Sequence, residues 1–431
     1  MHPLVIAGLV LLGLLLLFFL FAGFGHLTRG TPVSRVRSLD DSPLPPVSSK
    51  AFRELIQLAS GAGMHEGNSI EILANGDATY PRLWADLRSA RQSITLHLYY
   101  CQPGRMADEL KAILVDRARA GVRVLFLRDA FGSGRLTKEY TRELTDAGVT
   151  VCDFRPTHWY EMHKAQSRSH IRVVVVDGRI AYTGGFGIDD QWYGDGRTNG
   201  SWRETNVRFM GPAVAQHQAI FVAGWAEAAK DLLAGSQLFP ERQAHPVGDT
   251  FAASVHCAPT VGSTASERLF ALTISCSTRT LYIANAYFIP DDDFRKMLTD
   301  SAGRGVDVRV LTAGPPTDTK LTWYASHARY AQLLEGGVRI FEYQPTMMHS
   351  KATVADGIWS VVGTMNFDNR SFALNDESVV TAYDEGVAST LESLFLDDLT
   401  RSKEILIADW RRRPIHHRIY ERGATLMSRV L

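Results

Sequence analysis

The sequence has no excess of either charge and very little cysteine. Lys+Arg and Asp+Glu both total 46 in 431 residues, so the formal net charge is zero. The composition gives no excess of positive charge that would indicate a nucleic-acid partner, and we expect no nucleic acid to bind. The four cysteines form no CxxC pair and have no His-linked zinc spacing, so we expect free buried thiols and no metal or other cofactor. They are Cys101, Cys152, Cys257 and Cys276.

Charge is missing altogether from Pro3 to Gly25, and Leu9–Phe21 is rich in Leu and Phe. About 20 apolar residues suffice to cross a bilayer as a helix, so residues 1–28 are predicted to form a retained transmembrane anchor. A cleaved secretory signal is the alternative. No Lys or Arg precedes the run, and several arginines follow it, so the positive-inside rule predicts a single-pass protein of the cell membrane with a cytoplasmic body. These arginines are Arg29, Arg35 and Arg37.

Beyond the anchor, the chain is too long for one ordinary hydrophobic core. Residues 29–50 are rich in Pro and Ser and are predicted to form a linker. Apolar runs of strand length then alternate with segments of helical period, which predicts an α/β fold with substantially parallel sheets. The order of these runs repeats after about 180 residues. We therefore predict two fused domains related by internal duplication, at 51–245 and 246–431.

The repeat is clearest in two short motifs of the form His-x-(Arg/Lys)-x4-Asp. The first is followed by Gly184-Gly185 and the second by Gly363-Thr364, with Asn366 two residues later. Residues i and i+2 of a strand share a face, so each histidine projects beside its cation. The Asp-Gly pair that ends each motif predicts a hairpin turn. The motif residues are His170, Arg172 and Asp177 in the first copy, and His349, Lys351 and Asp356 in the second.

These residue types suit phosphoryl chemistry. One imidazole can attack phosphorus to form a phosphohistidine, while a second acts as general acid and then as general base. Arg172 and Lys351 would neutralise the phosphate oxygens. Asp177 and Asp356 are candidates for holding the imidazole tautomers, and Glu204 and Glu377 are alternatives for that role. The residues alone do not apportion it.

The paired motifs resemble those of the phospholipase D superfamily, whose signature continues through a Gly-Ser or Gly-Gly pair and an Asn. The second copy matches with His349, Lys351, Asp356, Thr364 in the Ser place, and Asn366. The first copy departs from the signature at Arg172, where Lys is usual, and at Gly187, in the Asn place.

Residues 60 to 415 look most like bacterial cardiolipin synthases. The resemblance implies two phospholipase D-like α/β/α sandwich domains around one active site. It implies metal-independent phosphatidyl transfer between two phosphatidylglycerol molecules, with His170 as nucleophile and His349 as acid/base. Substrate contacts are expected at Gly185, Glu204, Thr364, Asn366 and Glu377. Hydrolysis of a phospholipid or, less favoured, of nucleic acid stays open, as does an inactive membrane-tethered scaffold.

The C-terminal stretch from Trp410 to Arg429 is basic with apolar residues between the arginines. It has two interpretations, a helix that lies on anionic lipid or a solvated terminal helix.

Overall fold

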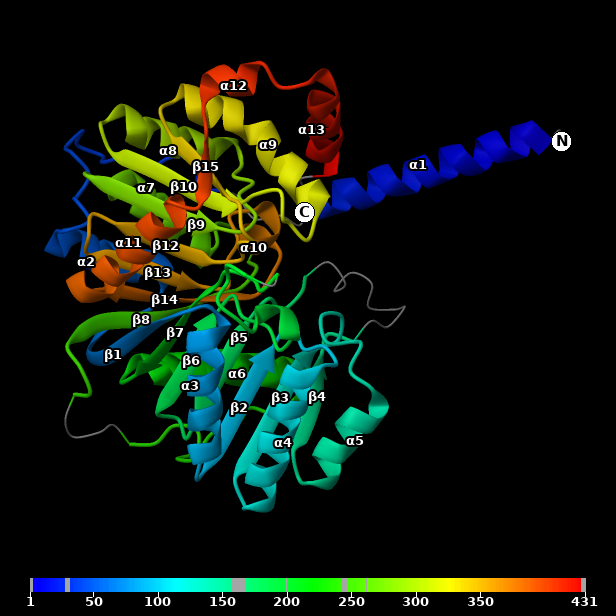
Figure 1. The fold of residues 1–431 in the computed structure, drawn as a ribbon, viewed down its shortest axis with the longest axis vertical. Helices are drawn as coiled ribbons and strands as arrows, with labels where there is room; N and C mark the ends of the chain where they lie inside the picture. The colour runs from blue at the N-terminus through cyan, green and yellow to red at the C-terminus, as the bar shows by residue number, and fades with distance from the viewer. Residues whose placement is uncertain are drawn as a thin grey trace.

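A computed structural model describes residues 3–27, 32–156, 167–198, 200–241, 246–260 and 262–427. Its centre is one mixed sheet of fifteen strands, in the order β15-β11-β10-β9-β12-β13-β14-β8-β1-β7-β6-β5-β2-β3-β4. Figure 1 shows the sheet running through the whole body with helices on either side of it. The predicted α/β class is confirmed, but the expectation of substantially parallel sheets is wrong. Most neighbouring strands pair antiparallel, because hairpins and returning strands form the middle of the sheet.

In the first half of the sheet, strands and helices alternate as far as β4, as the sequence predicts, and the hairpin β5–β6 and the strand β7 follow. Its strands are β1 (His65–Ala74), β2 (Ser93–Leu98), β3 (Arg123–Asp129), β4 (Thr150–Phe154), β5 (Arg172–Val176), β6 (Ile180–Gly184) and β7 (Thr205–Met210). Its helices are α3 (Asn75–Ser89), α4 (Arg105–Arg119), α5 (Lys138–Asp146) and α6 (Ala213–Ala229), with a 3-10 turn at Asp190–Trp192.

The second half repeats this plan and adds an edge strand. Its strands are β8 (Thr250–Cys257), β9 (Thr280–Asn285), β10 (Asp307–Ala313), β11 (Arg339–Tyr343), β12 (Lys351–Ala355), β13 (Trp359–Gly363), β14 (Glu377–Tyr383) and β15 (Ser402–Ile405). Its helices are α7 (Ala265–Cys276), α8 (Asp292–Gly303), α9 (Lys320–Glu335), α10 (Asn369–Ala373), α11 (Glu385–Leu399), α12 (Ile407–Arg411) and α13 (Ile415–Met427).

Read outward from the centre, each half has the same strand order. One half runs β1-β7-β6-β5-β2-β3-β4 and the other β8-β14-β13-β12-β9-β10-β11. The two meet where β1 pairs antiparallel with β8, so one sheet continues across the halves. The exact domain bounds stay a prediction, because residues 242–245 at the proposed junction lie outside the described residues.

Three apolar clusters hold the helices on the sheet. One packs α3, α4 and α5 on the first half, and a second packs α7, α8 and α9 on the other half, together with α2 (Lys50–Ser60). The third extends under both halves between the sheet and the helices α6 and α11. Its members include Val173 and Val175 of β5 and Val354 of β12. The two motif strands therefore share one core, which fixes them relative to each other.

Both predicted hairpins are present. Asp177-Gly178 joins β5 to β6 with φ of 51° and 62°, and Asp356-Gly357 joins β12 to β13 with φ of 53° and 70°. Positive φ at both central residues is what a type I′ hairpin turn requires, and Asp-Gly supplies it at low steric cost.

At the N-terminus, α1 (Pro3–Leu27) projects away from the body (Figure 1). Apolar side chains along it, such as Leu12 and Phe19, are exposed. Among the residues that the structure describes, none of the helices combines the length and apolar character needed to cross a bilayer. The predicted anchor and linker fall partly outside those residues, at positions 1, 2 and 28–31.

Candidate active site

The two histidine motifs occupy equivalent places at the start of β5 and β12. Arg172 and Lys351 are the first residues of these strands, and His170 and His349 lie two residues earlier. All four side chains are buried. The register explains the match, because Arg172 pairs with Leu98 at the end of β2 and Lys351 pairs with Asn285 at the end of β9. The side chains thus gather where the parallel strands end.

Each imidazole is paired with a carboxylate from the opposite half. His170 Nδ1 lies 3.0 Å from both carboxylate oxygens of Glu377, the first residue of β14. His349 Nδ1 lies 2.6 Å from Oε2 of Glu204, which immediately precedes β7. Neither half can therefore complete its own histidine–carboxylate pair. The structure brings both copies of the motif into one site.

Further donors hold the two carboxylates in place. Glu377 accepts hydrogen bonds from the hydroxyl groups of Thr364 at 2.5 Å and Ser371 at 2.7 Å. Glu204 accepts the backbone N–H of Thr205 at 2.9 Å. Gly185 is the first-copy equivalent of Thr364, and a Cβ atom there would lie 2.3 Å from Glu204 Oε2. A side chain at 185 would therefore displace the Glu204 carboxylate from its position beside His349.

The two cations sit differently beside their histidines. Lys351 Nζ lies 3.0 Å from Nε2 of His349 and donates to the His349 carbonyl at 2.5 Å. Arg172 donates through Nη1 to the His170 carbonyl at 2.6 Å and through Nε to the Phe186 carbonyl at 3.2 Å. Its guanidinium also lies 5.5 Å from the ring centroid of Tyr99. Arg172 is therefore more firmly fixed by the backbone than Lys351.

Burial shifts every ionisable group of this cluster toward its neutral form. It lowers the pKa of His170 and of His349 well below the usual range, and the neighbouring charges of Arg172 and Lys351 lower both further. Burial likewise lowers the pKa of Lys351 to about 7. It raises the pKa of Glu204 to about 7 and that of Glu377 to about 8. A neutral imidazole is the form that can act as a nucleophile, and protons are easily exchanged within such a cluster near neutral pH.

The motif aspartates lie elsewhere, which corrects the hypothesis that they hold the imidazoles. Asp177 follows β5, seven residues from His170, so about 23 Å of strand separates them. Its carboxylate accepts the backbone N–H groups of Arg91, Gln92 and Ser93. Asp356 does the same for residues 278–280 at the start of β9. These carboxylates fix the far end of the motif strands, and the imidazole partners are the glutamates.

The departure at Gly187 has a structural counterpart that the sequence did not reveal. A Cβ atom at Gly187 would lie 2.8 Å from the ring of Trp192, so this indole occupies the space of the missing asparagine side chain. Trp192 Nε1 donates to Glu204 Oε2 at 3.4 Å, and its ring packs 5.4 Å from that of His349. The signal in the sequence was weak, because a tryptophan five residues after a glycine belongs to no motif. In the second copy, Asn366 is present and buried.

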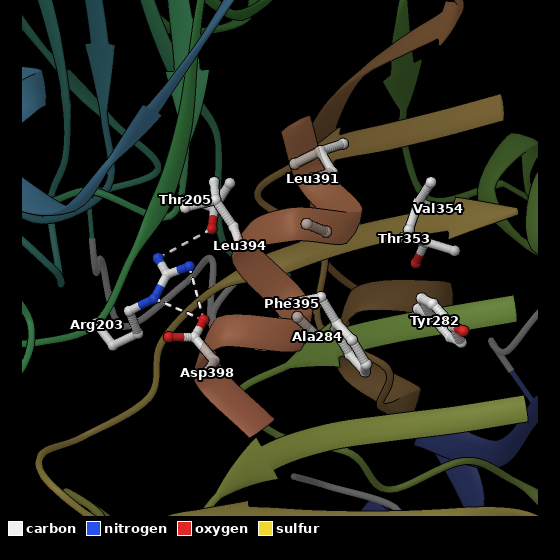
Figure 2. A pocket seen from close by; sticks show the side chains of 11 residues that line it. Arg203, Thr205, Tyr282, Ala284, Thr353, Val354, Leu391, Leu394, Phe395 and Asp398 are labelled. Atoms are coloured by element: carbon white, nitrogen blue, oxygen red, sulfur yellow. Dashed lines mark hydrogen bonds and ion pairs between the residues drawn. The ribbon is translucent and has the colours of Figure 1, made fainter. Parts of the chain in front are cut away.

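Arg203 fastens the Glu204 segment to the second half. Figure 2 shows its guanidinium against Asp398 of α11, with Nε and Nη2 at 2.8 and 2.7 Å from Oδ2. The Arg203 carbonyl accepts the backbone N–H of His349 at 2.7 Å. The small cavity drawn there lies between α11 and the strands β9 and β12, and none of the predicted site residues lines it. The contacts of Arg203 position the Glu204 segment, and the cavity beside them is not part of the catalytic cluster.

One group of side chains in the described part of the chain is close enough together to hold a metal ion. It consists of His327, His417 and Glu421, and it lies on α9 and α13, away from the two motifs. Glu421 is already paired with Arg413 through two bonds of 2.7 Å. None of the predicted site residues belongs to this group.

Comparison with known proteins agrees with this geometry. Residues 271–399 match the family described as "Cardiolipin synthase, PLD-like domain". The chain is 34% identical over 384 residues to a cardiolipin synthase of Geobacillus sp. (strain WCH70), covering 88% of this chain and 76% of that one. It is 31% identical to cardiolipin synthase A of Pseudomonas fluorescens (strain SBW25), over 84% and 75% of the two chains.

Among solved structures, the fold resembles that of phosphatidylserine synthase from Haemophilus influenzae Rd KW20. The TM-score is 0.70 at 11% identity, over 89% of this chain and all of that one. That likeness concerns the fold, whereas the identity to the curated relatives extends over most of both chains and establishes descent. The chain belongs to the cardiolipin synthase family of the phospholipase D superfamily.

Proposed function

We propose that this protein is a membrane-bound phosphatidyltransferase that makes cardiolipin from two molecules of phosphatidylglycerol through a phosphohistidine. The observation that carries the proposal is the exchange of carboxylates between the halves, with His170 on Glu377 and His349 on Glu204. Two oriented imidazoles and two cations in one buried cluster are what a double displacement at phosphorus needs. The cardiolipin synthases to which the chain is related supply the substrate class.

In the first displacement, His170 is the nucleophile. Its Nδ1–H is held by Glu377, so the lone pair of Nε2 is available to attack phosphorus. A P–N bond forms as the bond to the glycerol oxygen breaks. His349, whose protonated form is favoured once the anionic phosphodiester is bound beside it, gives its proton to that oxygen. Arg172 and Lys351 stabilise the charge that develops on the phosphate oxygens.

The second displacement reverses these roles. The hydroxyl group of a second phosphatidylglycerol attacks the phosphohistidine, His349 takes the hydroxyl proton, and the P–N bond breaks. Lys351 assists the exchange, because its Nζ lies 3.0 Å from His349 Nε2 and its pKa is lowered to about 7 by burial. Gly185, Thr364 and Asn366 line the space around the two carboxylates and the substrate phosphate.

We also propose that the N-terminal stretch of residues 1–28, part of which lies outside the described residues, holds the enzyme in the cell membrane as a single anchor, with the body in the cytoplasm. The support is the uncharged stretch from Pro3 to Gly25, the exposed apolar side chains of α1, and the arginines that follow it. A lipid-modifying enzyme gains direct access to its substrate from such a tether.

The test uses the purified full chain with phosphatidylglycerol vesicles, measuring cardiolipin and glycerol. His170→Ala and His349→Ala should each reduce cardiolipin formation by roughly 10³-fold or more, because each imidazole is needed in a half-reaction. His65→Ala, in β1 and outside the cluster, serves as the matched control. Near-native turnover by either active-site variant would overturn the two-histidine scheme.

Two further readouts separate the alternatives. Phosphatidic acid in place of cardiolipin would indicate a hydrolase, and no turnover of phosphatidylglycerol by the wild-type chain would indicate a scaffold. Acid quenching during turnover, followed by peptide mass spectrometry, locates the phosphatidyl group. We expect it on His170, and its appearance on His349 would exchange the two roles.

A further inference from the structure

A second candidate site lies between the helices α9, α12 and α13, at the C-terminal end of the chain. It is a groove of about 560 Å³, and none of its lining residues belongs to the active site. Five guanidinium groups line it and only one carboxylate does. The lining residues are Ala328, Arg329, Arg411, Arg413, Arg418, Glu421, Arg422 and Thr425.

The single carboxylate of the groove, Glu421, already forms an ion pair within the protein. Glu421 receives both hydrogen bonds of its ion pair from Arg413, whose guanidinium also stacks 4.4 Å from the ring centroid of Trp410. Arg418 and Arg422 stand one helical turn apart on α13 and are both exposed. Arg418 donates to the Arg411 carbonyl at 2.5 Å, which ties α12 to α13. Arg411 is paired with Glu335 at 2.8 Å, so the exposed guanidinium groups that the groove offers to an anion are those of Arg418 and Arg422.

Next to these arginines, α13 presents large apolar side chains to solvent. Ile415, Ile419 and Tyr420 are 77%, 63% and 55% exposed. Positions i and i+4 lie on one face of a helix, so Ile415 and Ile419 form a ridge. A helix with an exposed apolar ridge beside arginines has the character of an interfacial helix, one that lies in the headgroup layer of a membrane.

The groove also adjoins a helix that begins at the edge of the active site. Tyr287, whose ring centroid lies 5.9 Å from Lys351 Nζ, donates its hydroxyl to Asp318 at 2.6 Å, two residues before α9. The packing of α13 along α9 includes a 5.2 Å contact between the rings of Tyr324 and Tyr420. The helix α9 therefore connects a lipid surface at α13 with the edge of the catalytic cluster.

We propose that this groove binds the phosphate headgroup of an anionic phospholipid at the bilayer surface, while the ridge of α13 enters the headgroup layer. Guanidinium groups bind phosphate oxygens through paired, charge-assisted hydrogen bonds, and each surface arginine adds to the attraction of an anionic leaflet. The site is separate from the active site, and its role is to hold the body against the membrane. It does not depend on which reaction the histidines carry out.

The test uses the full chain in phosphatidylcholine nanodiscs that contain a small fraction of a photoactivatable lipid. One preparation carries photoactivatable phosphatidic acid and the other photoactivatable phosphatidylcholine, and peptide mass spectrometry measures labelling of residues 411–427. The variant Arg418→Gln/Arg422→Gln removes two groove charges. The control Arg119→Gln/Arg123→Gln removes two exposed arginines from the first half.

We expect the wild type to be labelled at residues 411–427 several-fold more by phosphatidic acid than by phosphatidylcholine. The preference should fall to near one in the groove variant, should be unchanged in the control, and should weaken at high salt. Equal labelling by the two lipids in the wild type, or an unchanged preference in the groove variant, would overturn the proposal. Cardiolipin formation in detergent micelles, measured on the same variants, should stay near wild type, so a failure here is distinguishable from a failure of the proposed reaction.

Discussion

The two halves of the molecule share a strand order but differ in the residues that they place around the two histidines. The first copy has Arg172 and Gly187 where the second has Lys351 and Asn366. Each copy nevertheless receives its carboxylate from the other, so the differences meet in a single cluster. A duplicated fold has thus become one asymmetric site, in which neither half is complete.

The asymmetry fits two different tasks for the histidines. Glu377 is held by two hydroxyl groups and keeps His170 in a fixed orientation, as a nucleophile requires. His349 has Lys351 against its Nε2 atom, and the rings of Trp192 and Trp202 pack against its imidazole. A group that must both give and take a proton benefits from an amine whose pKa is near 7.

The largest effects should come from breaking the exchanged carboxylate pairs. Glu377→Gln and Glu204→Gln should each lower kcat by roughly 10²- to 10³-fold, because an amide that donates to Nδ1 forces the proton onto Nε2. Glu377→Gln should be the more severe, since a proton on Nε2 removes the lone pair that attacks phosphorus. The measurement is the initial rate of cardiolipin formation by the two variants, with thermal melting to confirm folding.

Glu342→Gln provides a control for that comparison. Glu342 also pairs with a buried histidine, His327, at 2.6 Å, but outside the cluster. Its loss should affect stability without a specific loss of kcat in the folded enzyme. If Glu342→Gln lowered kcat as far as Glu377→Gln does, the exchanged pairs would have no special role in the reaction.

Exchanging the two cations tests whether the copies tolerate each other's residue. Lys351→Arg should lower turnover by about 10²-fold, because a larger side chain must fit a buried position in contact with His349 Nε2. Arg172→Lys should stay within a few-fold of wild type, since lysine can reproduce the bond from Lys351 to its histidine carbonyl. Measurements of kcat and KM for both variants test whether each position tolerates the other cation. A severe loss in Arg172→Lys would show that the first copy depends on the guanidinium fork.

Much of this molecule could be predicted from local patterns in the sequence. Strands such as β2 and β10, the helix α4 and both Asp-Gly hairpins follow from apolar periodicity and turn chemistry, which act between neighbours in the chain. The histidines and cations followed from the repeated motif. Local patterns do not report which carboxylate reaches which imidazole, because His170 and Glu377 are separated by 207 positions in the chain. For the same reason, the sequence did not indicate that Trp192 fills the space of the asparagine side chain that is missing at Gly187.

That replacement predicts an effect of intermediate size. Trp192→Phe keeps a ring beside His349 but removes the N–H that donates to Glu204, so kcat should fall by about tenfold or less. Trp202→Phe is the matched control, because its ring also packs against His349, at 5.1 Å. Steady-state kinetics of both variants should show a loss only for Trp192→Phe. Equal kcat values would mean that the indole acts by packing alone.

The smallest effect on catalysis should come from the motif aspartates, despite their place in the signature. Asp177→Asn weakens three charge-assisted bonds to backbone N–H groups, and should lower the free energy of unfolding by about 1–3 kcal/mol. Asp356→Asn should cost more, because Asp356 also accepts the Thr278 hydroxyl at 2.8 Å. Urea unfolding and kcat per folded enzyme separate the two quantities. A variant that kept its stability and lost turnover would show that these aspartates take part in the reaction. Lost stability with normal kcat per folded enzyme would show that they only fix the far ends of the strands that carry the histidines.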